Sequence, residues 1–257
     1  MDSRSYSPEN LLIFGITGYA RSGKDTAAKA ILDLIAKIGS ENRYAEYRDI
    51  NTRVIRYADP IKDATAEVMK YFFEPKLVLN PEFPELRYPH EIESVKQHLD
   101  IHKDKGEKIC DIDIRHTYQQ LGNVFRSQNK DIFALIAARR IEQDIEIYES
   151  SKTSYYNKLL SHDKTKHIYI IPDTRFVNEE KIMREKFGSC YRLIKIDKPD
   201  ITEKAKHSIP PYNHESEKQI ELLTPDKTVV NDSSLNVLNE NISTYVLKVM
   251  KLSGWLE

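Results

Sequence analysis

Short apolar runs alternate with longer stretches in which apolar residues recur every three or four positions. The first pattern is typical of buried strands and the second of amphipathic helices. Strands are predicted at 11–17, 53–58, 167–172, 191–197 and 228–231. Helices are predicted at 24–38, 60–73, 116–125, 131–148, 178–187, 215–222 and 235–252. Strands separated by helices imply parallel pairing, and therefore an α/β fold with a three-layer arrangement: a five-stranded, mostly parallel sheet with helices on both faces.

Two segments interrupt this alternation and are predicted to be insertions in a single domain that spans residues 1–257. Residues 74–113 are rich in proline and charge, and residues 198–214 combine three prolines with a lysine-histidine cluster. Such segments are typical of binding loops and lids, and also of solvated loops. We expect the first near an acceptor site and the second to be either a lid or a solvated loop. The polar residues 1–10 are expected to be a disordered lead-in.

Composition narrows the function classes. The 257 residues include 39 Lys and Arg against 40 Asp and Glu, a formal net charge of -1, so no global basic field indicates a nucleic-acid partner. No apolar run approaches the ~20 residues of a membrane span. The two cysteines, Cys110 and Cys190, form neither a disulfide framework nor a zinc-type spacing. We therefore expect a cytoplasmic protein without a membrane partner.

A glycine-rich segment follows the first predicted strand and precedes the first predicted helix. Gly18, Gly23 and Lys24 form the spacing Gly-x4-Gly-Lys, which matches the Walker A motif up to the lysine. Glycines let the backbone curl so that N–H groups point at phosphate oxygens, and the helix start adds partial positive charge. A lysine at this place contacts the β- and γ-phosphates of a nucleotide. The alternative is a glycine-rich turn that binds no ligand.

The motif departs from the standard one after the lysine. Asp25 stands where Ser or Thr normally meets magnesium, and Thr26 follows one residue later. Nucleoside monophosphate kinases also delay their threonine, in Gly-Lys-Gly-Thr, so the ending favours a small-molecule kinase over a GTPase or motor ATPase. Asp25 either contacts the metal or only stabilises the first helical turn.

Polar residues after other strands extend the candidate site. Asp173 ends an apolar run, as does the carboxylate that orders magnesium in nucleotide-binding proteins, and Arg175 is suited to bidentate phosphate binding. The alternative is a capping aspartate with a surface ion pair. Lys62 either binds a second phosphate or is a solvated surface lysine. Gln119 and Arg126 are suited to a base edge and a phosphate, but they lie in a segment that by itself indicates only an amphipathic helix.

Six short segments, taken in their order along the chain, resemble the deoxynucleoside monophosphate (dNMP) kinases of large bacteriophages, over about residues 11 to 245. The resemblance is carried by Arg21-Ser22-Gly23-Lys24-Asp25-Thr26, Pro60-Ile61-Lys62-Asp63-Ala64, Gln119-x-Leu121-Gly122, Pro172-Asp173-Thr174-Arg175 with Glu179, His214-x-Ser216-Glu217 and Val229-Val230-Asn231-Asp232-Ser233-Ser234-Leu235. It implies a P-loop kinase fold, with inserted NMP-binding and lid segments, that transfers the γ-phosphoryl of ATP to a dNMP. The cofactors implied are ATP and Mg²⁺, and the pathway implied is deoxynucleotide biosynthesis.

The resemblance also implies site residues. Catalysis would use Arg21, Lys24, Arg126 and Arg175. ATP would be held by Gly18, Arg21, Ser22, Gly23, Lys24, Asp25 and Thr26. The dNMP site would contain Ile61, Lys62, Gln119, Gly122, Asn123, Arg126, Phe133, Asp173, Arg175 and Glu179. The metal would be held by Asp25 and Asp173.

The chain departs from the family where the base would be contacted. The family usually reads Leu-Gly-Thr-Asp/Glu, then an arginine, then a tryptophan. Here Asn123 follows Gly122, the arginine comes one residue early at Arg126, and Phe133 stands near the tryptophan position.

Two alternatives to a dNMP kinase stay open, and a homodimer is an open alternative to a monomer. Animal phosphomevalonate kinases share a Ser-Gly-Lys-Asp loop and an Asp-x-Arg after a strand, so the acceptor could be another small phosphorylated molecule. Dephospho-coenzyme A kinase is a more distant option of this kind. A non-catalytic ATP-binding module would keep the loop without acceptor-dependent turnover.

Overall fold

The computed structural model describes residues 6–41, 50–69, 87–109, 112–152, 166–207 and 215–256. They fall into two compact units. The sheet unit combines Met1–Tyr57 with Ala134–Glu257, and the helical unit is Ala58–Phe133. The insertion predicted at 74–113 therefore belongs to a longer unit.

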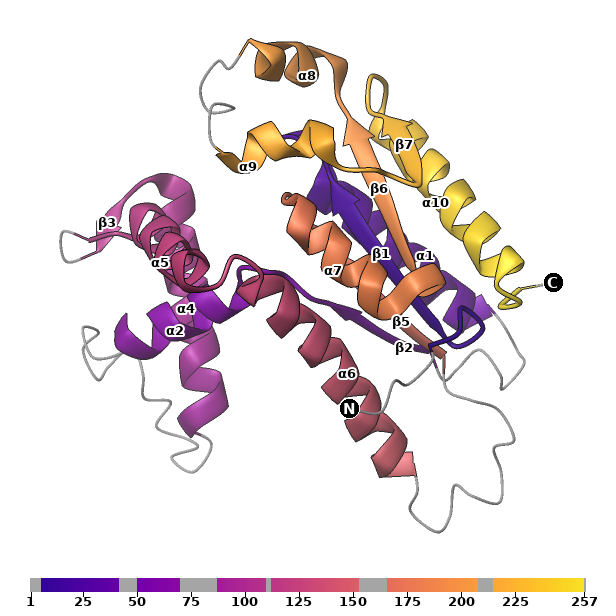
Figure 1. The fold of residues 1–257 in the computed structure, drawn as a ribbon, viewed down its shortest axis with the longest axis horizontal. Coiled ribbons are helices and arrows are strands. Elements are labelled where there is room, and N and C mark those ends of the chain that lie inside the picture. Colours follow the sequence, from indigo (N-terminus) through magenta and orange to yellow (C-terminus); the bar gives the residue numbers. More distant parts are fainter. Residues whose placement is uncertain are drawn as a thin grey trace. The chain divides into compact units, whose positions relative to one another are not determined.

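The sheet unit is built on five strands, which are β1 (Leu11–Thr17), β2 (Ile50–Val54), β5 (Lys166–Ile171), β6 (Tyr191–Asp197) and β7 (Lys227–Val230). Their order is β2-β5-β1-β6-β7, and every neighbouring pair is parallel (Figure 1). The register sets Ile13 of β1 opposite Tyr169 on one side and Tyr191 on the other. The predicted α/β class and five-stranded parallel sheet are confirmed.

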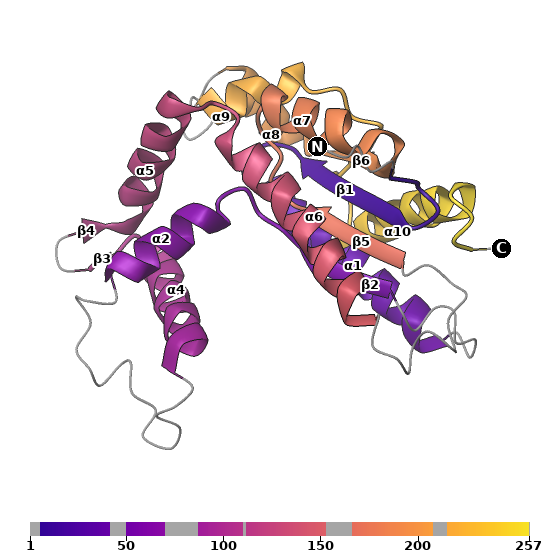
Figure 2. The same ribbon diagram turned by 60° about the horizontal axis from the view of Figure 1, so that its bottom comes forward.

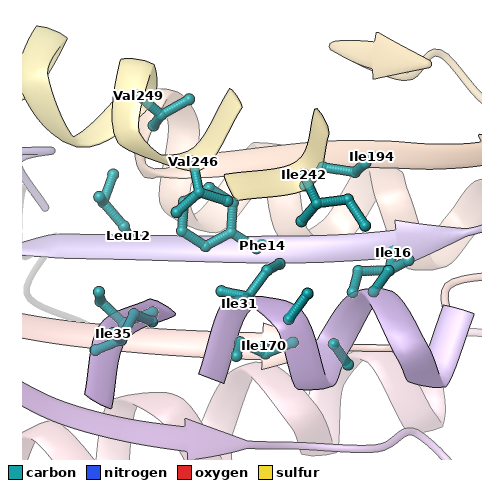
Figure 3. Close-up of a cluster of buried hydrophobic side chains, with 14 of the residues drawn as sticks. Leu12, Phe14, Ile16, Ile31, Ile35, Ile170, Ile194, Ile242, Val246 and Val249 are labelled. Carbon is teal, nitrogen blue, oxygen red and sulfur yellow. The ribbon is translucent and has the colours of Figure 1, made fainter. Parts of the chain in front are cut away.

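Side chains alternate across the sheet and meet helices on both faces. All seven residues of β1 are buried. Leu12, Phe14 and Ile16 pack into a core with helices α1 (Lys24–Glu41) and α10 (Leu235–Leu252), as Figure 3 shows. On β5, Ile168 and Ile170 join this core. The intervening Tyr169 donates from its hydroxyl to Asp144 of α6 (Ile132–Lys152) at 2.7 Å, which places α6 on the opposite face.

Several element boundaries differ from the predicted ones. Strand β2 is Ile50–Val54 rather than 53–58, because its register with β5 begins at Ile50 opposite Lys166. The predicted helix at 215–222 is a short α-helix, α9 (Glu215–Lys218), followed by the 3-10 turn Gln219–Leu222. Helices α7 (Val177–Phe187) and α10 lie where they were predicted.

Parts of the lead-in and of the second insertion are described. Within 6–10, the Pro8 carbonyl accepts a hydrogen bond from the Trp255 indole at 2.6 Å. In the segment 198–214, Pro199–Lys206 forms helix α8. Residues 1–5 and 208–214 lie outside the described residues.

The helical unit contains elements that the periodicity missed. Its described residues form α2 (Asp59–Met69), α4 (Arg87–Lys105), the strand pair β3 (Lys108–Ile109) and β4 (Ile112–Asp113), and α5 (Ile114–Gln128) (Figure 2). A small core holds it together, made of Ala66, Met69, Val95, Leu99, Ile109 and Ile114. Helix α4 lies within the predicted insertion, where prolines and charges obscured the helical repeat. Across the described part of both units, no helix has the length and apolarity needed to cross a membrane.

Candidate nucleotide-binding site

The candidate site of the sheet unit lies at the carboxyl ends of its strands, the edge where open α/β sheets bind ligands. We call residues 18–23, after β1, the glycine loop and residues 172–176, after β5, the strand-end turn. The turn is tied to β1 by a hydrogen bond from the Thr174 N–H to the Ile16 carbonyl at 3.0 Å. The loop is tied to the end of β7 by the Asn231 amide, which donates to the Ser22 carbonyl at 2.8 Å.

The glycine loop requires glycine at two positions. Gly18 has a φ of 142°, and a Cβ there would lie 2.5 Å from the Ile196 carbonyl oxygen. Gly23 has a φ of 106°, and its Cβ would lie 2.8 Å from the Asn231 amide nitrogen. Arg21 also has a positive φ, 65°, at the exposed tip of the loop. The loop is therefore tightly curled, as the Gly-x4-Gly spacing predicts.

The first turn of helix α1 continues the loop. It begins at Lys24, and its first N–H groups have no acceptor within the helix. Asp25 lies in that turn with an exposed side chain, which is favourable for an acid at a helix start whether or not it meets a metal. The Ser22 hydroxyl is buried and makes no hydrogen bond within the described residues. Donor groups gathered in this way fit the oxygens of a phosphate chain.

Lys24 reaches back across the loop. The residue is only 8% exposed, and its Nζ donates to the carbonyls of Gly18 at 2.7 Å and Tyr19 at 2.8 Å. Burial, with a smaller contribution from nearby Arg175, lowers the pKa of Lys24 to about 8, against the opposing pull of three carboxylates. The ammonium is therefore mostly charged at neutral pH and is directed into the loop.

Arg175 is held between two carboxylates. Its Nε donates to Oδ1 of Asp173 at 2.6 Å, and its Nη1 donates to Oε1 of Glu217 at 2.6 Å. Burial would lower the pKa of Arg175, but these neighbours outweigh it and raise the pKa. Glu217 belongs to α9, and sequence reasoning gave it no role. The sequence marked Glu217 only by its place in the segment His214-x-Ser216-Glu217, one of those that resemble phage dNMP kinases.

Glu179 supports the strand-end turn. Its Oε2 accepts hydrogen bonds from the backbone N–H groups of Arg175 at 2.8 Å and Phe176 at 3.1 Å. This is the contact that an acidic residue makes at the third position of a helix, here α7. These bonds fix the turn that carries Asp173 and Arg175, and the predicted place of Glu179 in the dNMP site stays a prediction.

The predicted metal ligands, Asp25 and Asp173, both act electrostatically on the Lys24 ammonium. Within the described residues, no group of three or more His, Cys, Asp or Glu side chains is placed to hold a metal. Magnesium in kinase sites is held by one or two carboxylates together with phosphate oxygens and water. The donor set fits that chemistry only with a nucleotide present, so the metal assignment stays a prediction.

In the helical unit, Lys62 has a partner that the sequence did not indicate. Its Nζ donates to Oδ2 of Asp100 at 2.6 Å, and Lys103 donates to the other carboxylate oxygen at 2.9 Å. Burial alone would raise the pKa of Asp100, but these hydrogen bonds outweigh it and lower the pKa. Lys62 is therefore not a fully solvated lysine, because it forms an ion pair at the start of α2, and its role as a phosphate ligand stays a prediction.

The remaining predicted residues of this unit lie around α5. Gln119, Gly122, Asn123 and Arg126 recur every three or four residues and so share one face of the helix. A Cβ on Gly122 would lie 3.2 Å from Ile61 Cδ1 and 3.2 Å from Arg126 Nη1. The Arg126 guanidinium lies 4.8 Å from the centre of the Phe133 ring. The structure therefore brings this group together, with Gln119 and Asn123 exposed.

Fold and site together define an α/β protein with a parallel sheet and a tightly curled glycine loop at the end of its central strand. Comparison of the chain with models of known protein families found no match, and a search of curated proteins found none either.

Proposed function

We propose that this protein is a P-loop kinase that transfers the γ-phosphoryl group of ATP to a deoxynucleoside 5'-monophosphate. One observation carries the proposal: the buried Lys24 ammonium lies against the carbonyls of Gly18 and Tyr19, at the carboxyl end of the central strand. A lysine directed into a curled loop at a helix start is suited to binding the β- and γ-phosphates.

Phosphoryl transfer needs positioning and charge neutralisation more than a covalent catalyst. In the proposed reaction, the N–H groups of the first turn of α1 bind phosphate oxygens, and Lys24 exchanges its two carbonyl acceptors for oxygens of the β- and γ-phosphates. Arg175, which already acts electrostatically on Lys24, stabilises charge on the transferred group. The carboxylates of Asp25, Asp173 and Glu217 repel a polyphosphate, and magnesium bound with ATP would offset this repulsion with its positive charge. The acceptor is already an anionic phosphate oxygen, so no strong general base is required.

The side chains of the helical unit support a deoxynucleoside monophosphate as the acceptor. The resemblance to phage dNMP kinases assigns the monophosphate to the Lys62 and Arg126 region, and amide and aromatic side chains share the α5 group with Arg126. Amides are suited to base edges and arginines to phosphates. A sugar phosphate without a base would offer no base edge with which the exposed amides of Gln119 and Asn123 could form hydrogen bonds.

The test is an acceptor panel. Purified full-length protein with Mg²⁺ and ATP is given dTMP, dGMP, dCMP, dAMP, phosphomevalonate or dephospho-coenzyme A, and ADP release is measured. We expect release with at least one dNMP and its loss, by at least a thousandfold, in Lys24→Ala. The exposed Lys29 on the same helix gives the matched control, and Lys29→Ala should behave as wild type.

Three outcomes would overturn the proposal. Release with phosphomevalonate alone would change the acceptor class. ATP binding without release for any acceptor would indicate a non-catalytic module. Equal activity of Lys24→Ala and Lys29→Ala would show that the glycine loop is not where ATP reacts.

A further inference from the structure

The buried carboxylate of Glu217 connects the glycine loop with Arg175 of the strand-end turn. Glu217 is 3% exposed and lies on α9, outside both the glycine loop and the strand-end turn. Its Oε1 accepts from Arg175 Nη1 at 2.6 Å, and its Oε2 accepts from the Ala20 N–H of the glycine loop at 3.0 Å. We infer that Glu217 is a positioning residue that fixes the Arg175 guanidinium relative to the glycine loop. The inference rests on the proposed kinase function for its kinetic consequences.

The geometry requires a carboxylate. Both acceptor oxygens are used, each by a different donor, and an ionised carboxylate has no donor of its own. A glutamine of the same shape has one oxygen and one NH₂ group, so it can accept from Ala20 or from Arg175 but must turn a donor toward the other. The substitution therefore breaks one contact while hardly changing volume.

Glu217 also belongs to a segment that holds the loop by a second route. Tyr19 of the loop packs in a small apolar cluster with Ile201, Ala205 and Ile220, from α8 and the 3-10 turn. Its hydroxyl donates to Oε1 of Glu221 at 2.8 Å. The glycine loop is thus anchored at Tyr19 by α8 and the 3-10 turn and at Ala20 by Glu217 of α9, and Glu217 also contacts Arg175.

The test compares Glu217→Gln with Glu215→Gln, which removes the same charge from an exposed position of the same helix. The position of the guanidinium is followed by NMR of isotope-labelled arginine side chains, with the Arg175 signals assigned by their loss in Arg175→Lys. We expect the Arg175 signals of Glu215→Gln to match those of wild type, and those of Glu217→Gln to shift. In the kinase assay, kcat of Glu217→Gln should fall about tenfold to a hundredfold, the scale of one charge-assisted hydrogen bond, with a smaller change in either KM.

A second variant separates charge from position. Glu217→Asp keeps the charge but is too short to reach Ala20 and Arg175 together, so it should shift the Arg175 signals and lower kcat as well. Thermal melting checks that both variants are folded. Unchanged Arg175 signals and unchanged kcat in folded Glu217→Gln would overturn the inference. Wild-type protein without activity on any dNMP would overturn the proposed function instead, and the Arg175 signals would still decide the role of Glu217.

Discussion

The glycine loop of the sheet unit and the α5 face of the helical unit are both candidate phosphate-binding regions, and they are built differently. The glycine loop depends on backbone conformation, with Gly18 and Gly23 at positive φ and Lys24 buried. The α5 face depends on side chains projecting from an ordinary helix, several of them exposed. We therefore expect a substitution in the glycine loop to cause a large loss of ligand binding, and a substitution on the α5 face to cause a smaller one.

Gly18→Ala should produce the largest effect. The new Cβ would lie 2.5 Å from the Ile196 carbonyl oxygen, a backbone atom that cannot move aside, and φ is 142°. We expect ATP affinity to fall at least a hundredfold, measured by calorimetry, with a lower melting temperature. Wild-type ATP affinity in Gly18→Ala would contradict the claim that the loop conformation makes the site.

The second prediction concerns pH. Since the pKa of Lys24 is lowered to about 8, its charged form is present below that pH and is lost as the pH rises through it. If the ammonium binds ATP, kcat/KM should fall about tenfold per pH unit well above pH 8. Lys24→Arg cannot titrate in this range, so its residual activity should lack this limb. A limb that persists in Lys24→Arg would belong to another group.

Lys62→Ala should give a moderate effect that tests the helical unit. If Lys62 binds the acceptor phosphate, the KM for the dNMP should rise about tenfold while the KM for ATP stays unchanged. Lys103 pairs with the same Asp100 carboxylate and provides the matched control, since Lys103→Ala removes only a partly exposed ion pair. Equal effects of the two variants on the dNMP KM would favour a purely structural role for Lys62.

Gly122→Ala should give the smallest effect and completes the comparison with Gly18→Ala. The neighbours of its Cβ are the ends of flexible side chains, Ile61 Cδ1 and Arg126 Nη1, both at 3.2 Å. Alanine is favoured over glycine in a helix by about 1 kcal/mol, which offsets this crowding. We expect the free energy of unfolding to change by less than about 1 kcal/mol and the dNMP KM by less than about threefold. A loss as large as that of Gly18→Ala would mean that the α5 face also depends on backbone fit.

The sequence predicted the sheet unit better than the helical unit for physical reasons. Strand β1 and helix α10 were predicted with the observed bounds because a fully apolar run and a long amphipathic repeat leave little ambiguity. The glycine loop was predictable because Gly18 and Gly23 adopt positive φ angles that strongly favour glycine. Helix α4 was missed because its sequence is mostly polar and only a few residues, such as Val95 and Leu99, reach the core.

The sequence indicated several residues of the candidate site, but it did not indicate which side chains contact one another. Asp173 and Arg175 were chosen for their place after a strand, and the structure pairs them. Glu217 was not chosen, because nothing local distinguishes it from the neighbouring acids Glu215 and Glu221. Its role depends on two contacts far away in sequence, with Ala20 and Arg175.

Phosphoryl transfer from ATP to a dNMP is tested most directly by following the phosphoryl group itself. Phosphorus NMR of the full chain with Mg²⁺, ATP and the four dNMPs should show ATP converted to ADP while the β-phosphate signals of a deoxynucleoside diphosphate grow in equal amount. Lys24→Ala should show neither change. ATP that stays intact, or that yields only ADP and inorganic phosphate, would contradict a kinase acting on deoxynucleoside monophosphates.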